Sequence, residues 1–189
     1  HTSFIKLHHN NLLVVGQKIL LIMMINHIHN LNKIYWVLQN TGYKKNGFYL
    51  EIGAHDGKEG SNTYLLDTKY KWKGLCIDIL LDNMEERSCM QQGLVSNKIE
   101  EVDFVFAEGL SGIDGLNLKW NNTPLVKNGK KQKFKTEITQ TVLDKYNVPS
   151  FVDYLSLDVE GSELLVLEGI NHKKHVFGII SIEHNNMDK

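Results

Sequence analysis

The sequence has few of the residues that mark disulfide-stapled, nucleic-acid-binding or membrane-spanning proteins. Its 189 residues include two cysteines, Cys76 and Cys89, so we expect neither a disulfide scaffold nor a thiolate metal site and predict a reducing, cytoplasmic compartment. A formal net charge of −1 provides no electrostatic attraction for a phosphate backbone, which argues against nucleic acid as a partner. The apolar stretch over residues 12–25 is too short for a membrane span and is interrupted by Gln17 and Lys18, so it predicts a buried helix.

One cluster of positive charge lies in residues 127–135. It consists of Lys127, Lys130, Lys131, Lys133 and Lys135, interrupted by Gly129. Runs of like charge in a polar context are typical of solvated segments. We therefore expect a loop here, as part of a long polar loop over residues 109–133.

Short apolar segments alternate with segments of helical periodicity along the rest of the chain. Strands are predicted at residues 48–52, 74–78, 93–95, 102–106, 154–157 and 178–182. Helices are predicted within residues 17–39, 61–68, 81–90, 141–146 and 162–167. This alternation predicts an α/β fold with a doubly wound, mostly parallel sheet and helices on both faces. We expect one domain, in which a helical N-terminal segment over residues 1–46 packs on a core formed by residues 47–189.

Four of the predicted strands have acidic residues at their carboxyl ends or within a few residues of them. These are Glu51, Asp78, the pair Asp158 and Glu160, and Glu183. Ligands of doubly wound sheets bind at the carboxyl ends of the strands, where these side chains should meet. The sequence therefore predicts an acidic ligand site at one edge of the sheet.

The turn after the first of these strands has the composition of a ligand-binding loop. Gly53 and Gly57 let the backbone approach a ligand closely, and Ser61 and Asn62 lie at the start of the next helix, where free N–H groups attract anions. Asp78 follows the glycines by about 20 residues, a position suited to binding ribose hydroxyls. A nicotinamide-dependent oxidoreductase shares these features but normally has the fuller GxGxxG turn, which this chain lacks.

Several blocks of the sequence resemble the FkbM family of methyltransferases, in the same order along the chain. The cofactor-binding opening of that family is similar to GFYLEIGAHDG at 47–57 with GSNT at 60–63, and its second strand to WKGLCID at 72–78. A recurring loop matches LSGI at 110–113, and the later blocks match DYLSLDVEGSE at 153–163 and IEHN at 182–185. Together the matches cover about residues 47–185.

The resemblance implies a class I, Rossmann-like methyltransferase fold that uses S-adenosylmethionine and methylates oxygen. It implies cofactor contacts from Glu51, Gly53, Ala54, His55, Gly57, Ser61, Asn62, Asp78, Ile79, Val95, Ser96 and Asp158. The glycine turn would hold the methionine end, Asp78 the ribose, and Val95 with Ser96 the adenine. The chain departs from the family at His55, often asparagine, and at Asp78, usually glutamate. The C-terminal antiparallel hairpin of the class is missing before Lys189.

Methylation of a hydroxyl also requires removal of its proton, so a positioned base is expected. Asp158 is the predicted base, with Glu160 and Glu183 in support and His184 as a further candidate. An alternative is that Asp158, Glu183 and Asn185 hold Mg²⁺ or Mn²⁺, which would bind two acceptor hydroxyls.

The resemblance also indicates the kind of acceptor. Members of the family are associated with sugar and polyketide hydroxyls, so we expect a small-molecule or glycan acceptor, and a sugar hydroxyl in the first place. A different interpretation is a non-catalytic module of the same fold within a larger glycan-modifying protein. The start at His1 and the end soon after a predicted strand favour a piece of a larger multidomain chain.

Overall fold

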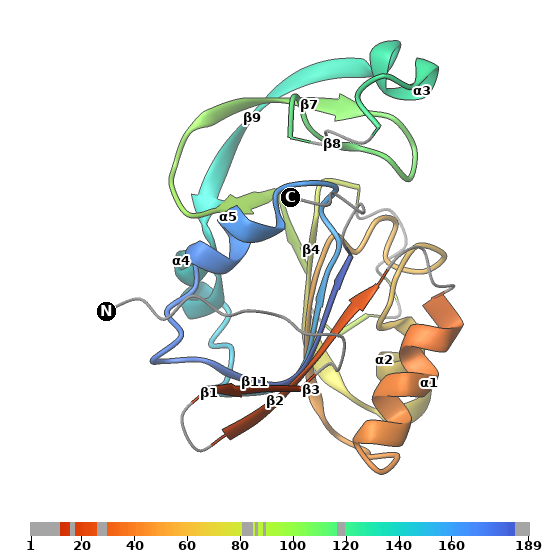
Figure 1. Cartoon of the computed structure of the whole chain (residues 1–189), viewed down its shortest axis with the longest axis vertical. Coiled ribbons are helices and arrows are strands. Elements are labelled where there is room, and N and C mark those ends of the chain that lie inside the picture. Colours follow the sequence, from red (N-terminus) through yellow and green to blue (C-terminus); the bar gives the residue numbers. More distant parts are fainter. Residues whose placement is uncertain are drawn as a thin grey trace.

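The computed structural model describes residues 12–15, 18–25, 30–80, 85, 87–88, 90–116 and 120–183. A seven-stranded sheet runs through the middle of this part of the chain, and a four-stranded sheet lies across one end of it (Figure 1). The fold is therefore a mixed α/β architecture, as the alternation in the sequence predicts.

The main sheet has the strand order β1-β2-β11-β10-β3-β4-β5. The strands are β1 (Leu12–Val15), β2 (Lys18–Ile25), β3 (Phe48–Ile52), β4 (Lys73–Asp78), β5 (Met90–Gln92), β10 (Phe151–Leu157) and β11 (Val176–Glu183). The described pairings are parallel except for that of β1 with β2. The carboxyl ends of the parallel strands consequently lie at one edge of the sheet.

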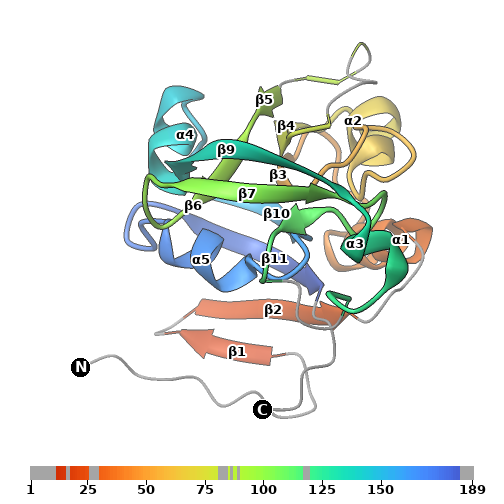
Figure 2. The same ribbon diagram turned by 90° about the horizontal axis from the view of Figure 1, so that it is seen from above.

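Helices cover both faces of this sheet. One face carries α1 (Asn30–Asn40) and α2 (Tyr64–Tyr70), and the other carries α4 (Thr139–Lys145) and α5 (Glu163–Glu168), as Figure 2 shows. Adjacent strand residues point to opposite faces, so Tyr49 packs in the cluster with α1 while Leu50 packs in the cluster with α4. Strands buried on both faces in this way read as short continuous apolar runs, which is why β3, β4, β10 and β11 were predictable.

The second sheet has the order β6-β9-β7-β8. Its strands are β6 (Leu94–Ser96), β7 (Glu101–Phe106), β8 (Gly112–Ile113) and β9 (Lys130–Ile138), and α3 (Pro124–Lys127) precedes β9. The β7–β9 pair is antiparallel and lies above the carboxyl ends of the main strands (Figure 1). This layer closes one side of the candidate site.

The prediction of a helix over residues 12–25 is wrong, because this segment forms β1 and β2. Residues 19–25 are all apolar, and a run of this length is compatible with either a buried helix or a buried parallel strand. The structure uses it as a strand that pairs with β11, from Leu21 opposite Ile179 to Ile25 opposite Glu183. Helix α1 begins only at Asn30. Within the described ranges, no helix is long and apolar enough to cross a membrane.

The loop expected over residues 109–133 is also wrong in part. The basic run belongs largely to β9, where Lys133 lies opposite Asp103 and forms a 2.6 Å ion pair with Glu101 on β7. Lys131 makes a 2.6 Å ion pair with Asp114. Opposite charges across a strand pair favour the pairing. The lysines are solvated, as expected, but they lie on a strand and not in a loop.

Two further predictions need adjustment. The strand expected at 93–95 is β6, but it joins the second sheet, and β5 takes the edge beside β4. Helix α2 begins at Tyr64, three residues later than predicted. Much of the helix predicted at 81–90 falls on residues 81–84, 86 and 89, outside the described part of the chain.

Candidate active site

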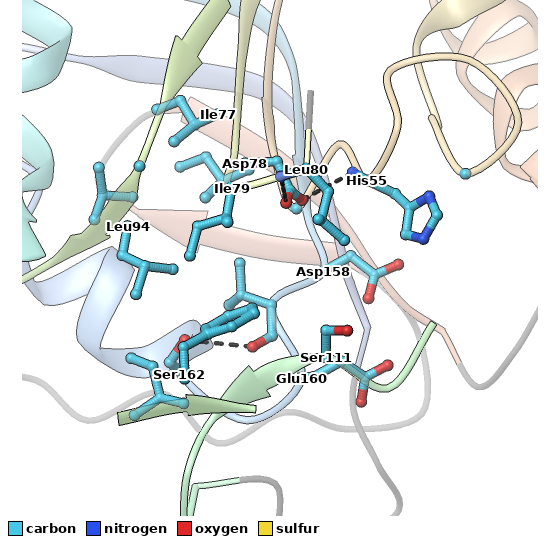
Figure 3. Close-up of a pocket in the computed structure, with 18 of the residues that line it drawn as sticks. His55, Ile77, Asp78, Ile79, Leu80, Leu94, Ser111, Asp158, Glu160 and Ser162 are labelled. Atoms are coloured by element: carbon cyan, nitrogen blue, oxygen red, sulfur yellow. Dashed lines mark hydrogen bonds between the residues drawn. The ribbon is translucent and has the colours of Figure 1, made fainter. Parts of the chain in front are cut away.

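A cavity of about 430 Å³ lies between the carboxyl ends of the main strands and the second sheet (Figure 3). Its walls come from the residues that follow β3, β4 and β10, from the start of β6, and from the β7–β8 connection. In the view of Figure 3, Ile79 and Leu94 lie on one side and Asp158 and Glu160 on the other. Cavities of this size with apolar walls and a few convergent polar groups are typical of small-molecule sites.

Gly53 allows the ends of β3 and β10 to approach each other. Its φ is +87°, and a Cβ atom at this position would lie 1.7 Å from the carbonyl oxygen of Asp158. A backbone hydrogen bond from Asp158 N to Ile52 O (3.0 Å) joins these two strand ends, and one from Gly53 N to Ile77 O (2.9 Å) ties the turn to β4. A side chain here would therefore separate the strand ends that form the cavity.

Three non-glycine residues at the cavity also have positive φ: His55 at 51°, Glu108 at 52° and Glu160 at 52°. The turn around Glu160 is held by Glu163, whose Oε1 accepts hydrogen bonds from Gly161 N at 3.1 Å and from Val159 N at 3.3 Å. Such conformations are uncommon outside glycine, and they gather at functional sites.

Asp78 is fixed at the end of β4 by the loop after β3. Its Oδ2 accepts a hydrogen bond from His55 N at 2.8 Å and its Oδ1 accepts one from Leu80 N at 3.0 Å (Figure 3). Burial raises the pKa of Asp78, and the backbone donors act in the opposite direction. The carboxylate keeps further lone pairs that face the cavity, so it can accept hydrogen bonds from a ligand.

Glu51 lies beneath the glycine turn and is fully buried. Its carboxylate accepts hydrogen bonds from Ser61 Oγ (2.7 Å), from Thr63 Oγ1 (2.6 Å) and from Asn62 N. Among the described residues that line the cavity, Glu51 does not occur. Its visible role is to anchor the segment that leads into α2.

Arg87 is a buried partner of Glu51 that no pattern in the sequence indicates. Its side chain is 0% exposed, and it forms ion pairs with Asp67 (Nε to Oδ2, 3.1 Å) and with Glu51 (Nη2 to Oε2, 3.6 Å). It also donates to Thr63 Oγ1 at 2.6 Å. The guanidinium therefore joins β3, α2 and the glycine turn from behind the cavity.

Three carboxylates from two strand ends converge at the other side of the site. Ligand oxygens of Asp158, Glu160 and Glu183 lie within 4.8 Å of one another. Lys33, from α1, places its Nζ 3.4 Å from Asp158 Oδ2 and 3.4 Å from Glu183 Oε2. Burial raises the pKa of Asp158 to about 7, with a further rise from Glu183 and an opposing effect of Lys33.

The structure distributes the sequence-predicted residues over three environments. The cavity is lined by Gly53, His55, Asp78, Ile79, Val95, Asp158 and Glu160. Glu51, Ala54, Gly57, Ser61, Asn62 and Ser96 are buried beside it without being among its described lining residues. Glu183 reaches the site through Lys33, whereas His184 and Asn185 lie outside the described residues.

Lys33 is the functional candidate that the sequence interpretation missed. A signal for it existed, since Lys33 precedes Ile34 and lies one helical turn before Val37, on the apolar stripe of α1. A lysine on a buried stripe needs a partner, and the partners here are distant in sequence.

Comparisons with known proteins bear on the same part of the chain. Residues 51–188 match a family model described as the methyltransferase FkbM domain. Neither the curated proteins nor the solved structures contain a match to the chain. The matched segment runs from the end of β3 to beyond β11, includes Asp78 and the acidic cluster, and spans well over half of the sequence, so this chain belongs to the FkbM family of methyltransferases.

Proposed function

We propose that this methyltransferase takes its methyl group from S-adenosylmethionine and transfers it to a hydroxyl oxygen of a sugar in a glycan. The observation that carries this proposal is the presence, in one cavity, of a backbone-anchored carboxylate at Asp78 and of the Asp158 carboxylate, whose pKa burial raises to about 7. The first suits a ribose, and the second suits an acceptor hydroxyl.

The cavity residues fit S-adenosylmethionine. Asp78 would bind the ribose hydroxyls, and the apolar side chains of Ile79, Leu94 and Val95 offer a surface for adenine. The carboxylates of Asp158 and Glu160 favour a positively charged ligand. When bound, the cofactor supplies an electrophilic methyl group on a sulfonium sulfur.

The methionine end would lie toward the glycine turn. Asn62 is 1% exposed, and its carboxamide nitrogen and oxygen have no hydrogen-bond partner within the part of the chain that the structure describes. A buried amide without partners is costly, which supports a role for Asn62 near a polar ligand group. Ser61 acts through Glu51, to which its hydroxyl donates.

Asp158 would remove the proton of the acceptor hydroxyl. A base with a pKa near the operating pH is partly ionised and still basic enough to take a proton, and Asp158 meets that condition. Lys33 holds its carboxylate by an ion pair at Oδ2 and pairs with Glu183 as well. Orientation of acceptor and donor in the cavity would supply much of the remaining acceleration, up to ~7–11 kcal/mol in favourable cases.

A second hollow supports a glycan as the acceptor. It adjoins the first cavity through Glu108, which lines both, and it is bordered by Thr123, Asn128 and Lys130. Carboxylate, hydroxyl, amide and ammonium groups together match the hydroxyls of a saccharide chain. A sugar at the first cavity could therefore extend its neighbours across the second.

The cofactor is tested by isothermal titration calorimetry with S-adenosylhomocysteine. We expect micromolar binding by the wild type and a loss of about 10- to 100-fold in Asp78→Ala, because hydrogen bonds to a charged group are worth about 1.5–3 kcal/mol. Asp103→Ala, at an exposed acid on β7, is the matched control and should bind normally.

The outcomes separate the alternatives. A folded wild type that does not bind would refute the use of S-adenosylmethionine at this cavity. Binding followed by methyl transfer to a panel of glycan acceptors would support the whole proposal. Binding without transfer to any acceptor would instead favour a non-catalytic module of the same fold.

A further inference from the structure

Lys33 reaches the active site because of how the N-terminal strand is placed. Strand β2 runs parallel to β11, and Ile25 at its end lies opposite Glu183. The chain enters α1 five residues later, so Lys33 in the first turn of this helix lies at the carboxyl edge of the sheet. Ile34 and Val37 pack in the core and fix the helix at this position.

The contacts of Lys33 are those of a buried ion, not of a surface lysine. Its side chain is 4% exposed, against 9% for Glu183 and 22% for Asp158. A buried ammonium is tolerated only when it is paired, and closely spaced carboxylates disfavour one another's ionisation unless a cation lies among them. Lys33 and the two carboxylates therefore satisfy each other.

We propose that the Lys33 ammonium is the resident cation of this active site: it positions Asp158 and Glu183 for deprotonation of the acceptor, and it fills the place where a divalent metal ion would otherwise bind. The positioning role rests on the proposed function, whereas the exclusion of a metal ion does not. Lys33 precedes residue 51, where the match to the family begins, so the cation comes from outside the matched segment.

The competition between lysine and metal follows from the geometry. Mg²⁺ and Mn²⁺ favour clustered carboxylate oxygens, and the three acidic side chains here offer oxygens within 4.8 Å of one another. The ammonium is 3.4 Å from two of those three groups, so a divalent ion at the same oxygens would face a positive charge at close range. Removal of the ammonium leaves the carboxylates without that neutralising charge.

The test is a Mn²⁺ titration of the full chain, followed by the electron paramagnetic resonance signal of free Mn²⁺. We expect Lys33→Met to bind one Mn²⁺ at least tenfold more tightly than the wild type. Lys33→Arg keeps the charge and should bind like the wild type. Lys44→Met is the matched control, since Lys44 forms a 2.6 Å pair with Asp153 away from the cavity.

Turnover provides the second readout once an acceptor is found. Lys33→Met should lower kcat by at least tenfold with little change in the KM for S-adenosylmethionine, and Lys33→Arg should recover part of kcat. Equal Mn²⁺ affinity in a folded Lys33→Met variant and the wild type would overturn the proposal. Unchanged kcat in that variant would do the same.

Two controls keep the result interpretable. If Lys33→Met does not fold, the wild type decides: Mn²⁺ binding that is weakened by Glu183→Gln overturns the proposal, and Mn²⁺ affinity indifferent to that substitution supports it. Failure of the wild type to bind S-adenosylhomocysteine would refute the proposed function while the Mn²⁺ comparison still tests metal exclusion.

Discussion

Substitution of Gly53 by alanine isolates the closest backbone approach in the site. The new Cβ atom would lie 1.7 Å from the carbonyl oxygen of Asp158, and the φ of +87° is itself unfavourable for alanine. Relief of the clash requires β3 and β10 to separate at their carboxyl ends. That movement breaks the hydrogen bond from Asp158 N to Ile52 O, which joins the two strand ends.

The expected loss of stability follows from these two effects. A left-handed backbone costs a non-glycine residue ~1–2 kcal/mol. The lost backbone hydrogen bond adds about 1 kcal/mol. We expect the free energy of unfolding of Gly53→Ala to fall by about 2–3 kcal/mol, measured by urea denaturation followed by circular dichroism.

Gly115 supplies the matched control for backbone strain alone. Its φ is +82°, close to that of Gly53, but a Cβ atom there would meet nothing within 4 Å among the described residues. Gly115→Ala should therefore lose only ~1–2 kcal/mol. If the two variants lose the same free energy to within about 0.5 kcal/mol, the clash with Asp158 has no energetic weight and the reasoning about the strand ends fails.

Three more predictions concern the base, the buried guanidinium and the second hollow. With Asp158 as the base, kcat should rise about tenfold per pH unit up to a pH near 7 and then level, because only the ionised carboxylate accepts a proton. A kcat that stays constant between about pH 5 and about pH 8 would contradict this role. Arg87→Met should lower the free energy of unfolding by about 3–5 kcal/mol, since it leaves buried carboxylates without their cation, while Lys98→Met at an exposed ion pair should lower it by under about 1 kcal/mol. Similar losses for both variants in urea denaturation would argue against a stabilising role of the buried network. Lys130→Ala should raise the KM for a glycan acceptor without changing the affinity for S-adenosylhomocysteine, and Lys131→Ala, the control, should change neither. An unaltered KM in Lys130→Ala would show that the second hollow does not bind the acceptor.

The parts of the fold that were predictable are those set by local pattern. Strand β10 is a short, mostly apolar run that Asp158 follows directly, and the position of Asp158 at the sheet edge follows from the rule for parallel strands. Strand β9 was not predictable, because four of its nine residues are lysines and its pairing with β7 depends on distant acidic partners. Strand β2 was ambiguous because a uniformly apolar run carries no periodicity.

The residues of the site likewise divide into those that local sequence patterns predict and those that depend on distant contacts. Asp78 and Asp158 were found because each ends or follows a strand, whereas Glu51 is the penultimate residue of β3 and points to the face it shares with Tyr49. Its carboxylate therefore accepts hydrogen bonds from the turn, and Glu51 is not among the described residues that line the cavity. Lys33 meets Asp158 across a separation of 125 residues, which local sequence patterns do not encode.

The pairing of β2 with β11 has a consequence for the order of folding. These strands come from opposite ends of the described chain, so during synthesis β2 can pair with β1 but lacks its other neighbour until β11 has emerged. An apolar strand with unsatisfied backbone groups is prone to associate with other chains in that interval. Contacts between distant segments also form slowly, because loop closure must precede them. The edge of the sheet that leads to Lys33 is thus expected to assemble last. Its assembly should also be the folding step most sensitive to temperature and to chaperones.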